Sequence, residues 1–135
     1  MAGYLNGPLP SKLTLLSDLP MFSTGDKIRF LGCVEQYSSK SATLTLEHNY
    51  PQGQSVKAHV DVQLLLSSLK PHETQIGEWV NVIGYVTKNS EGGGSNKDDI
   101  QIHVQALILW STGSFDLHGY ERSLVSRILH SLGND

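Results

Sequence analysis

The chain has 135 residues, of which 39% are hydrophobic, so it can form one ordinary domain with a core. Ten Lys and Arg against 13 Asp and Glu give a net charge of -3, and no two basic residues are adjacent. A protein that binds nucleic acid tightly by itself usually carries a basic surface, because neutralising phosphates supplies most of the affinity. The composition therefore argues against tight stand-alone binding to DNA or RNA.

The lack of a recognisable targeting signal and the single cysteine predict a location inside the cell. No stretch reaches the roughly 18–20 consecutive apolar residues of a membrane span, and the first residues lack the basic and apolar regions of a secretory signal. The single cysteine, Cys33, allows no internal disulfide and fits a reducing compartment. We expect a soluble intracellular protein with no membrane contact.

Three regions follow one another along the chain. Residues 1–24 are rich in Gly and Pro and are predicted to form an N-terminal arm that lies across the domain. Residues 25–110 alternate between strand patterns and turns and are predicted to form a barrel. Residues 111–135 are predicted to form a C-terminal helix that packs on the barrel and on a partner.

Two segments of the barrel region share one template. Gly25–Val34 reads GDKIRFLGCV and Gly77–Val86 reads GEWVNVIGYV. Both are rich in β-branched and aromatic residues, which favour strands. Each has an internal glycine, Gly32 or Gly84, which in a strand usually marks a bulge or a tight bend. We expect two neighbouring strands of a small barrel, with these glycines at its corners.

Alternation of apolar and polar residues predicts five strands in all. They cover residues 27–37, 42–47, 55–61, 78–88 and 100–110. A Leu-rich segment, residues 62–71, predicts a short helix that ends at a proline. Three strands, a helix, two strands and a terminal helix are the element order of the OB-fold, an all-β, five-stranded Greek-key barrel.

The fifth strand has the clearest pattern. Its apolar residues recur at every second position from Ile100 to Trp110. Such alternation places them on one face of the strand. We therefore expect Ile108 and Trp110 to belong to the core.

Catalytic and metal sites are not indicated. The six histidines lack the paired spacing of zinc sites, and Cys33 has no neighbouring thiol. His59 and Asp61 share one strand face, where side chains of this kind are usually just solvated. The three glycines of residues 92–94 lack the lysine of a phosphate-binding loop. We expect no enzyme activity, no metal and no cofactor.

Aromatic and basic side chains on the strands are candidates for stacking on unpaired bases. The nucleic-acid candidates are Arg29, Tyr37, Lys57 and Tyr85. The direction of Trp79 and Tyr85 stays open, because they share a face with both Asn81 and Ile83. A weak direct contact with single strands and a role in partner binding are both compatible with this pattern. The acidic loop of residues 89–99 would repel phosphate.

The terminal helix is predicted over residues 115–132, with Ser114 as its N-cap and Asp116 in its first turn. Its apolar residues cover about 180° of the helix, whereas docking on the barrel alone requires a stripe of about 100°. One interpretation is that all of them are internal core. The other is that one edge packs on the barrel and the other edge meets a second protein.

Five segments, in this order, together resemble the fungal Ten subunit of the telomere-capping CST complex. They are Leu13–Pro20, Gly25–Val34, Thr45–Pro51, Val60–Leu66 and Gly77–Val86. The resemblance extends from about residue 13 to residue 132. It implies an OB-fold that pairs with the N-terminal OB domain of the Stn subunit, beside a larger DNA-binding subunit. It also implies support of single-stranded telomeric DNA binding, end protection and length regulation in the nucleus at telomeres, without catalytic residues.

The same resemblance implies that the C-terminal helix contributes to the Stn contact. Together with the width of the apolar arc, this gives a set of candidate partner-binding residues: Leu117, Tyr120, Leu124, Val125 and Ile128. The alternative is a stand-alone OB-fold protein that binds single-stranded nucleic acid through Tyr37, Tyr85 and Arg29.

Overall fold

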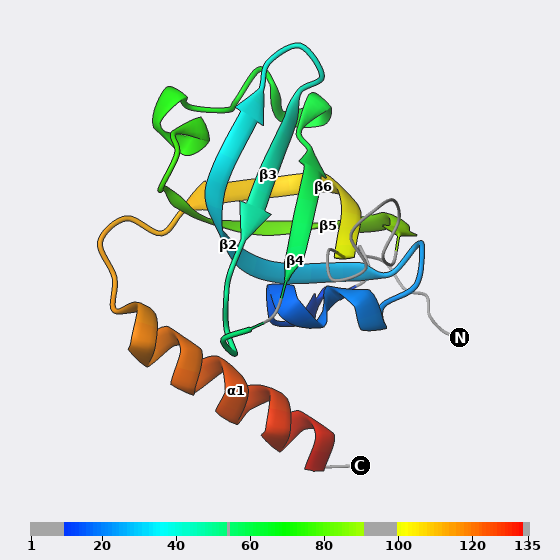
Figure 1. The fold of residues 1–135 in the computed structure, drawn as a ribbon, viewed down its shortest axis with the longest axis vertical. Helices are drawn as coiled ribbons and strands as arrows, with labels where there is room; N and C mark the ends of the chain where they lie inside the picture. Colours follow the sequence, from blue (N-terminus) through cyan, green and yellow to red (C-terminus); the bar gives the residue numbers. More distant parts are fainter. Residues whose placement is uncertain (1–9, 54, 91–99, 134–135) are drawn as a thin grey trace.

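The protein folds as a closed β-barrel with a helix at its C-terminal end (Figure 1). The computed structural model describes residues 10–53, 55–90 and 100–133. The strands are β1 (Lys12–Leu13), β2 (Lys27–Ser38), β3 (Thr43–Glu47), β4 (Val56–Asp61), β5 (Trp79–Ser90) and β6 (Ile100–Ser111). Their order is β1-β2-β3-β4-β6-β5, and β2 also pairs with β5, which closes the barrel. The predicted OB-fold is confirmed.

The helical segments are short except for the last. They are the 3-10 turns η2 (Leu16–Met21), η3 (Gln63–Leu65) and η4 (Pro71–Thr74), and the α-helix α1 (Leu117–Gly133). The helix predicted between the third and fourth long strands is therefore two 3-10 turns. The predicted cap at Ser114 is wrong, because α1 begins at Leu117 and the Tyr120 N–H donates to the Asp116 carbonyl.

Part of the predicted arm belongs to the barrel itself. β1 runs parallel to the start of β2, and η2 places Leu16 and Leu19 in the core. The first nine residues of the arm, and most of the predicted loop of residues 89–99, lie outside the described residues.

The two template segments lie next to each other, as predicted, because β2 pairs antiparallel with β5. Gly84 stands opposite Ile28, and Gly32 stands opposite Val80. A Cβ atom on Gly84 would overlap the carbonyl group of Gln105, lying 2.9 Å from its carbon. Only a residue without a side chain lets β5 and β6 come this close.

Alternation correctly predicts which side chains of the short strands face inward. The completely buried residues of the core come from every long strand and include Ile28, Phe30, Leu44, Leu46, Ala58, Val60, Val80, Val82 and Ile102. Burial of this apolar surface is the main favourable contribution to folding.

The prediction for the end of β6 is wrong. Ile83 pairs with Ile108 whereas Gly84 pairs with Ala106, so Leu107 is an extra residue in β6. Such a bulge reverses the alternation beyond it. Leu109 now packs against the core, Ile108 is 52% exposed, and Trp110 lies outside the barrel with Arg29 over its ring.

Replacing Gly84 by alanine is expected to lower the free energy of unfolding by about 1–3 kcal/mol, because the added methyl group meets backbone atoms that have no room to move. Denaturant unfolding of the purified variant measures this. Thr87→Ala, at an exposed position of the same strand, is the control and should stay within about 0.5 kcal/mol of the parent protein. Equal stability of the two variants would show that β5 and β6 separate readily at Gly84.

Candidate functional site

A buried polar pair fastens α1 to the barrel. His48 follows β3, and its Nε2 lies 2.7 Å from Oε2 of Glu121 on α1. His48 is 4% exposed and Glu121 is 6% exposed. His118, one turn before Glu121, reaches the other carboxylate oxygen at 3.6 Å from an exposed position. Because a buried polar group that loses its partner is costly, this pair holds the helix in one orientation.

The sequence carries a signal for this pair that the histidine spacing alone does not reveal. His48 continues the inward series of Leu44 and Leu46, at a position where an apolar residue would be expected. Glu121 lies four residues after Leu117 and three before Leu124, within the apolar arc of α1. A titratable residue inside an apolar pattern indicates that its side chain has a polar partner in the fold.

Aromatic rings extend this contact from the barrel to the start of α1. The His48 ring meets Trp79 edge-on at 5.2 Å between centroids. Trp79 meets Phe115 at 6.2 Å, and Phe115 meets Tyr120 at 6.1 Å. These are ordinary distances for edge-to-face aromatic pairs. Trp79 therefore faces outward from the barrel, which settles the direction that the sequence left open.

The middle of α1 lies over Arg29 and Leu13. A small pocket there is lined by residues of β1, β2 and α1: Leu13, Arg29, Tyr120, Ser123, Leu124 and Arg127. Leu124 is 2% exposed and provides the main apolar anchor of the helix. Burial raises the pKa of the Tyr120 hydroxyl, and Arg29 and Arg127 offset only part of this effect. Tyr120 therefore docks as a neutral phenol.

The surface on which α1 docks contains buried polar atoms that lack hydrogen-bond partners. Within the described part of the chain, Arg29 Nε, His48 Nδ1 and the Tyr120 hydroxyl oxygen are buried without a hydrogen-bond partner. Buried polar atoms of this kind weaken an interface, each by about 1–3 kcal/mol. α1 is thus held by a few strong contacts rather than by continuous apolar packing.

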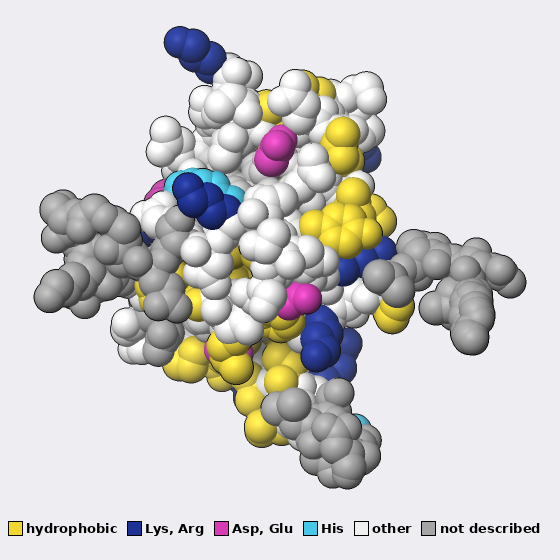
Figure 2. All heavy atoms as spheres, turned by 90° about the vertical axis from the view of Figure 1, so that its right-hand side faces the viewer, with side chains coloured by type: hydrophobic (Ala, Val, Ile, Leu, Met, Phe, Trp, Pro, Cys, Tyr) yellow, Lys and Arg dark blue, Asp and Glu magenta, His cyan; other side chains and the backbone are white. Residues whose placement is uncertain are grey.

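The predicted partner-binding residues divide into two groups. Leu124 is buried within the chain, whereas Leu117, Tyr120, Val125 and Ile128 are half-buried. Ile128 borders a groove of about 580 Å³ between α1 and the arm. The groove is lined by Lys12, Leu13, Thr14, Asp18, Met21, Phe22, Asp26, Arg127 and Ile128. Figure 2 shows hydrophobic and basic side chains gathered at the lower end of the molecule, where α1 lies.

The predicted nucleic-acid residues are not brought together. Arg29 lies under α1 with its guanidinium 5.3 Å from the centre of the Trp110 ring. Tyr37 packs against the core. Lys57 lies between Glu35 and Glu47, and Tyr85 stands opposite Lys27 at the far end of the β2–β5 pairing.

Lys57 is an ion-pair residue rather than an available cation. Burial by itself would lower its pKa, but the hydrogen bonds to Glu35 and Glu47 outweigh this, so that the pKa is raised. With two carboxylates beside it, Lys57 has little attraction left for a phosphate.

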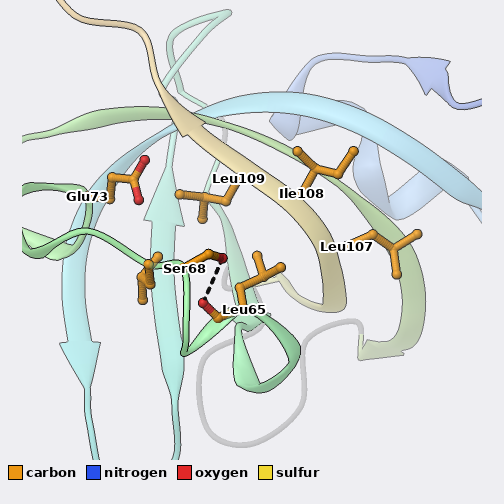
Figure 3. A pocket seen from close by; sticks show the side chains of 7 residues that line it. Leu65, Ser68, Glu73, Leu107, Ile108 and Leu109 are labelled. Atoms are coloured by element: carbon orange, nitrogen blue, oxygen red, sulfur yellow. Dashed lines mark hydrogen bonds between the residues drawn. The ribbon is translucent and has the colours of Figure 1, made fainter.

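An apolar pocket of about 140 Å³ opens beside the bulge of β6 (Figure 3). Its lining residues are Leu65, Ser68, Leu69, Glu73, Leu107, Ile108 and Leu109. The Ser68 hydroxyl donates to the Leu65 carbonyl at 3.2 Å, and a Glu73 carboxylate oxygen accepts from the Lys70 N–H at 2.9 Å. The Ser68 hydroxyl and the Glu73 carboxylate of this pocket thus serve local turns.

The described residues include no group of three or more His, Cys, Asp and Glu that could hold a metal ion. Among helices in the described ranges, none combines the length and the apolarity needed to cross a membrane.

Comparison with known proteins identifies the family. A family model described as Ten1, telomere capping, CST complex subunit, matches residues 1–125. The chain belongs to this family. None of the curated protein sequences compared with the chain matches it.

Solved structures of family members and of another OB-fold protein share the fold. A chain in the crystal structure of the S. pombe Stn1–Ten1 complex is similar to this protein, with 24% identity, a TM-score of 0.63, and coverage of 90% of this chain and 94% of that chain. S. pombe Ten1 alone has 24% identity, a TM-score of 0.60, and coverage of 87% and 97%. U. maydis replication protein A bound to single-stranded DNA has 17% identity, a TM-score of 0.57, and coverage of 93% and 94%.

Removing the carboxylate of Glu121 is expected to loosen α1. Glu121→Ala leaves His48 buried without its partner and should lower the free energy of unfolding by about 1–3 kcal/mol. Amide hydrogen exchange should also speed up throughout α1. His118→Ala removes only the exposed neighbour of the same carboxylate and should change stability by less than about 0.5 kcal/mol. If the two variants behave alike, the buried pair does not hold the helix.

Proposed function

We propose that this chain is a non-catalytic adaptor that forms a heterodimer with the N-terminal OB domain of an Stn-type subunit. A larger DNA-binding subunit completes the assembly, which acts at telomeres in the nucleus. In this role the chain supports the holding of single-stranded telomeric DNA, end protection and the regulation of telomere length. Membership of the telomere-capping family and the fold shared with Ten1 in an Stn1–Ten1 complex support the proposal.

The observation that carries the proposal is the unpartnered edge of α1. Leu129 is 62% exposed, and Val125 and Ile128 beside it are half-buried. These three residues lie on one side of the helix, since they are three or four positions apart. Across the groove, Met21 is 81% exposed. Complete burial of one such side chain stabilises an interface by about 1.5–3 kcal/mol, so a second protein would cover this edge favourably.

The charge of the chain supports a shared rather than an independent contact with DNA. The net charge is -3, and the four residues predicted to bind nucleic acid are dispersed over the molecule. Tight binding to single-stranded DNA requires several phosphate contacts. We infer that partner subunits supply most of them.

A double substitution on the open edge of α1 tests the heterodimer. Val125→Asp with Leu129→Asp places two charges where the partner would bury apolar surface. Affinity for the Stn-type N-terminal domain should fall by at least about tenfold. Size-exclusion chromatography and calorimetry of the mixed proteins measure this.

Both outcomes of that experiment are informative only if the variant stays folded. The structure therefore favours these two positions over Leu124, whose burial makes it part of the chain's own packing. Ser126→Asp with His130→Asp, at two exposed positions of the same helix, adds the same number of acidic residues on another side of α1 and should leave binding unchanged. Undiminished binding of the folded double variant would place the partner elsewhere.

Titration of the isolated chain with single-stranded DNA tests the shared contact. We expect binding weaker than about 1 μM at physiological salt, because few phosphates are neutralised. Fluorescence anisotropy at two salt concentrations measures both the affinity and its salt dependence. Submicromolar affinity with a steep salt dependence would favour the stand-alone binder instead.

A further inference from the structure

Two histidines lie side by side on the outer face of the barrel. His59 on β4 stands opposite His103 on β6 in the parallel pairing of these strands. Their ring centroids are 5.1 Å apart, and the ring planes differ by 26°. Both side chains are half-buried, so the pair is accessible from outside the barrel.

The His59 ring is held by neighbours on two strands. The Nδ1 of His59 lies 3.3 Å from the Thr45 hydroxyl on β3, and its Nε2 is bonded to the Gln101 side-chain oxygen on β6. In one neutral tautomer the hydroxyl donates to Nδ1 and Nε2–H donates to Gln101, so both ring nitrogens are satisfied. Such a ring loses little rotational freedom when a ligand binds over the pair.

The His103 ring is neutral. Burial lowers the pKa of His103, and the nearby His59 and Lys88 lower it further. Asp61 lies two residues after His59 on β4, and its carboxylate accepts from the Gln63 N–H at 2.8 Å. At physiological pH the His103 ring therefore stays uncharged.

These rings line a groove of about 330 Å³. Its lining residues are Gln36, Ser38, Ser41, Thr43, Thr45, His59 and His103. Among the described residues that line it there is no carboxylate, in contrast to the surroundings of Lys57 with Glu35 and Glu47. Lys40 is exposed in the β2–β3 turn between Ser38 and Ser41, and Lys88 stands opposite His103 on β5. The groove thus combines hydroxyl and amide groups, two imidazole rings and two nearby cations.

We propose that this groove takes unpaired bases of single-stranded nucleic acid, with the His59–His103 pair as the stacking platform. Stacking on an aromatic side chain is tolerant of sequence, because every base has a flat face, and histidine serves as such a side chain in single-strand recognition. The hydroxyl and amide groups would meet base edges, and the two lysines would meet phosphates. Oligonucleotides generally approach OB-folds from this side; the paired imidazoles are particular to this chain. The inference rests on the proposed contribution to DNA binding and gives it a location.

Mapping by NMR locates the contact. The isotopically labelled chain is titrated with a short oligo-deoxythymidine and with a G-rich single strand. Signals of His59, His103, Thr43 and Thr45 are expected to shift together and to saturate. Shifts that cluster instead around Tyr85 and Arg29, or no shifts at saturating DNA, would overturn the proposal.

Substitutions measure the strength of the contact in the heterodimer with the Stn-type domain. His103→Ala should weaken binding of the single strand by about fivefold or more, which is the usual effect of losing one stacking side chain. Thr43→Glu, which places a carboxylate in the groove, should weaken it at least as much and guards against misfolding of the first variant. His130→Ala and Ser126→Glu, both exposed on α1, are the matched controls and should leave the affinity unchanged.

The two proposals fail in different ways. If the heterodimer forms and both groove variants bind single strands as the parent does, the groove is not the subsite while the adaptor function stands. If no heterodimer forms yet the groove variants weaken DNA binding by the chain alone, the subsite stands without the adaptor function.

Discussion

β2 bonds to different strands along its two halves, and the rest of the barrel depends on how it bends between them. From Lys27 to Cys33 it pairs with β5, and from Cys33 to Ser38 it pairs with β3. A strand that changes neighbours must turn its pleated face sharply, and at that point Gly32 lies against Leu46, where a Cβ atom would come within 2.8 Å of the Leu46 Cβ. The close approach at Gly84 on the facing strand completes the bend. Once β2 curls in this way, the inward side of every other strand is determined.

The bulge at Leu107 is a consequence of the same closure, and it creates the surface on which α1 rests. By reversing the alternation of β6, it moves Trp110 out of the barrel and under Arg29. The half-buried Trp79 lies on the outer side of the neighbouring strand β5. Its ring contacts Phe115, whose ring in turn contacts Tyr120. A strand without the extra residue would bury Trp110 and turn Leu109 outward instead, so Arg29 would lose its aromatic partner. The bulge also exposes Ile108 and opens the apolar pocket beside η3.

Local patterns reveal much of this fold but not the pairs formed between distant segments. Alternation of apolar and polar residues, together with the two glycines, is enough to predict the strands. These patterns can be recognised within a single segment of the sequence. The bulge is not visible in that way, because Ile108 and Trp110 continue the alternation perfectly and only the pairing with Ile83 and Gly84 displaces them. The candidate site follows the same rule. Lys57 has the appearance of a free cation until β2 and β3 bring Glu35 and Glu47 beside it, whereas His48 and Glu121 are out of place within their own apolar patterns.

The proposed surfaces for protein and for nucleic acid are separate on this small barrel. The open edge of α1, with Val125, Ile128 and Leu129, shares no residue with the groove lined by His59 and His103. The two surfaces also differ in chemistry, since the edge of α1 offers aliphatic side chains and the groove offers hydroxyl groups and imidazole rings. A chain with a net charge of -3 gains little from long-range attraction to DNA, but a stacking platform acts only at contact and needs no such attraction. An adaptor held to a partner by its helix can therefore receive a strand that the partner has already captured, because tethering raises the local concentration of the strand at the groove.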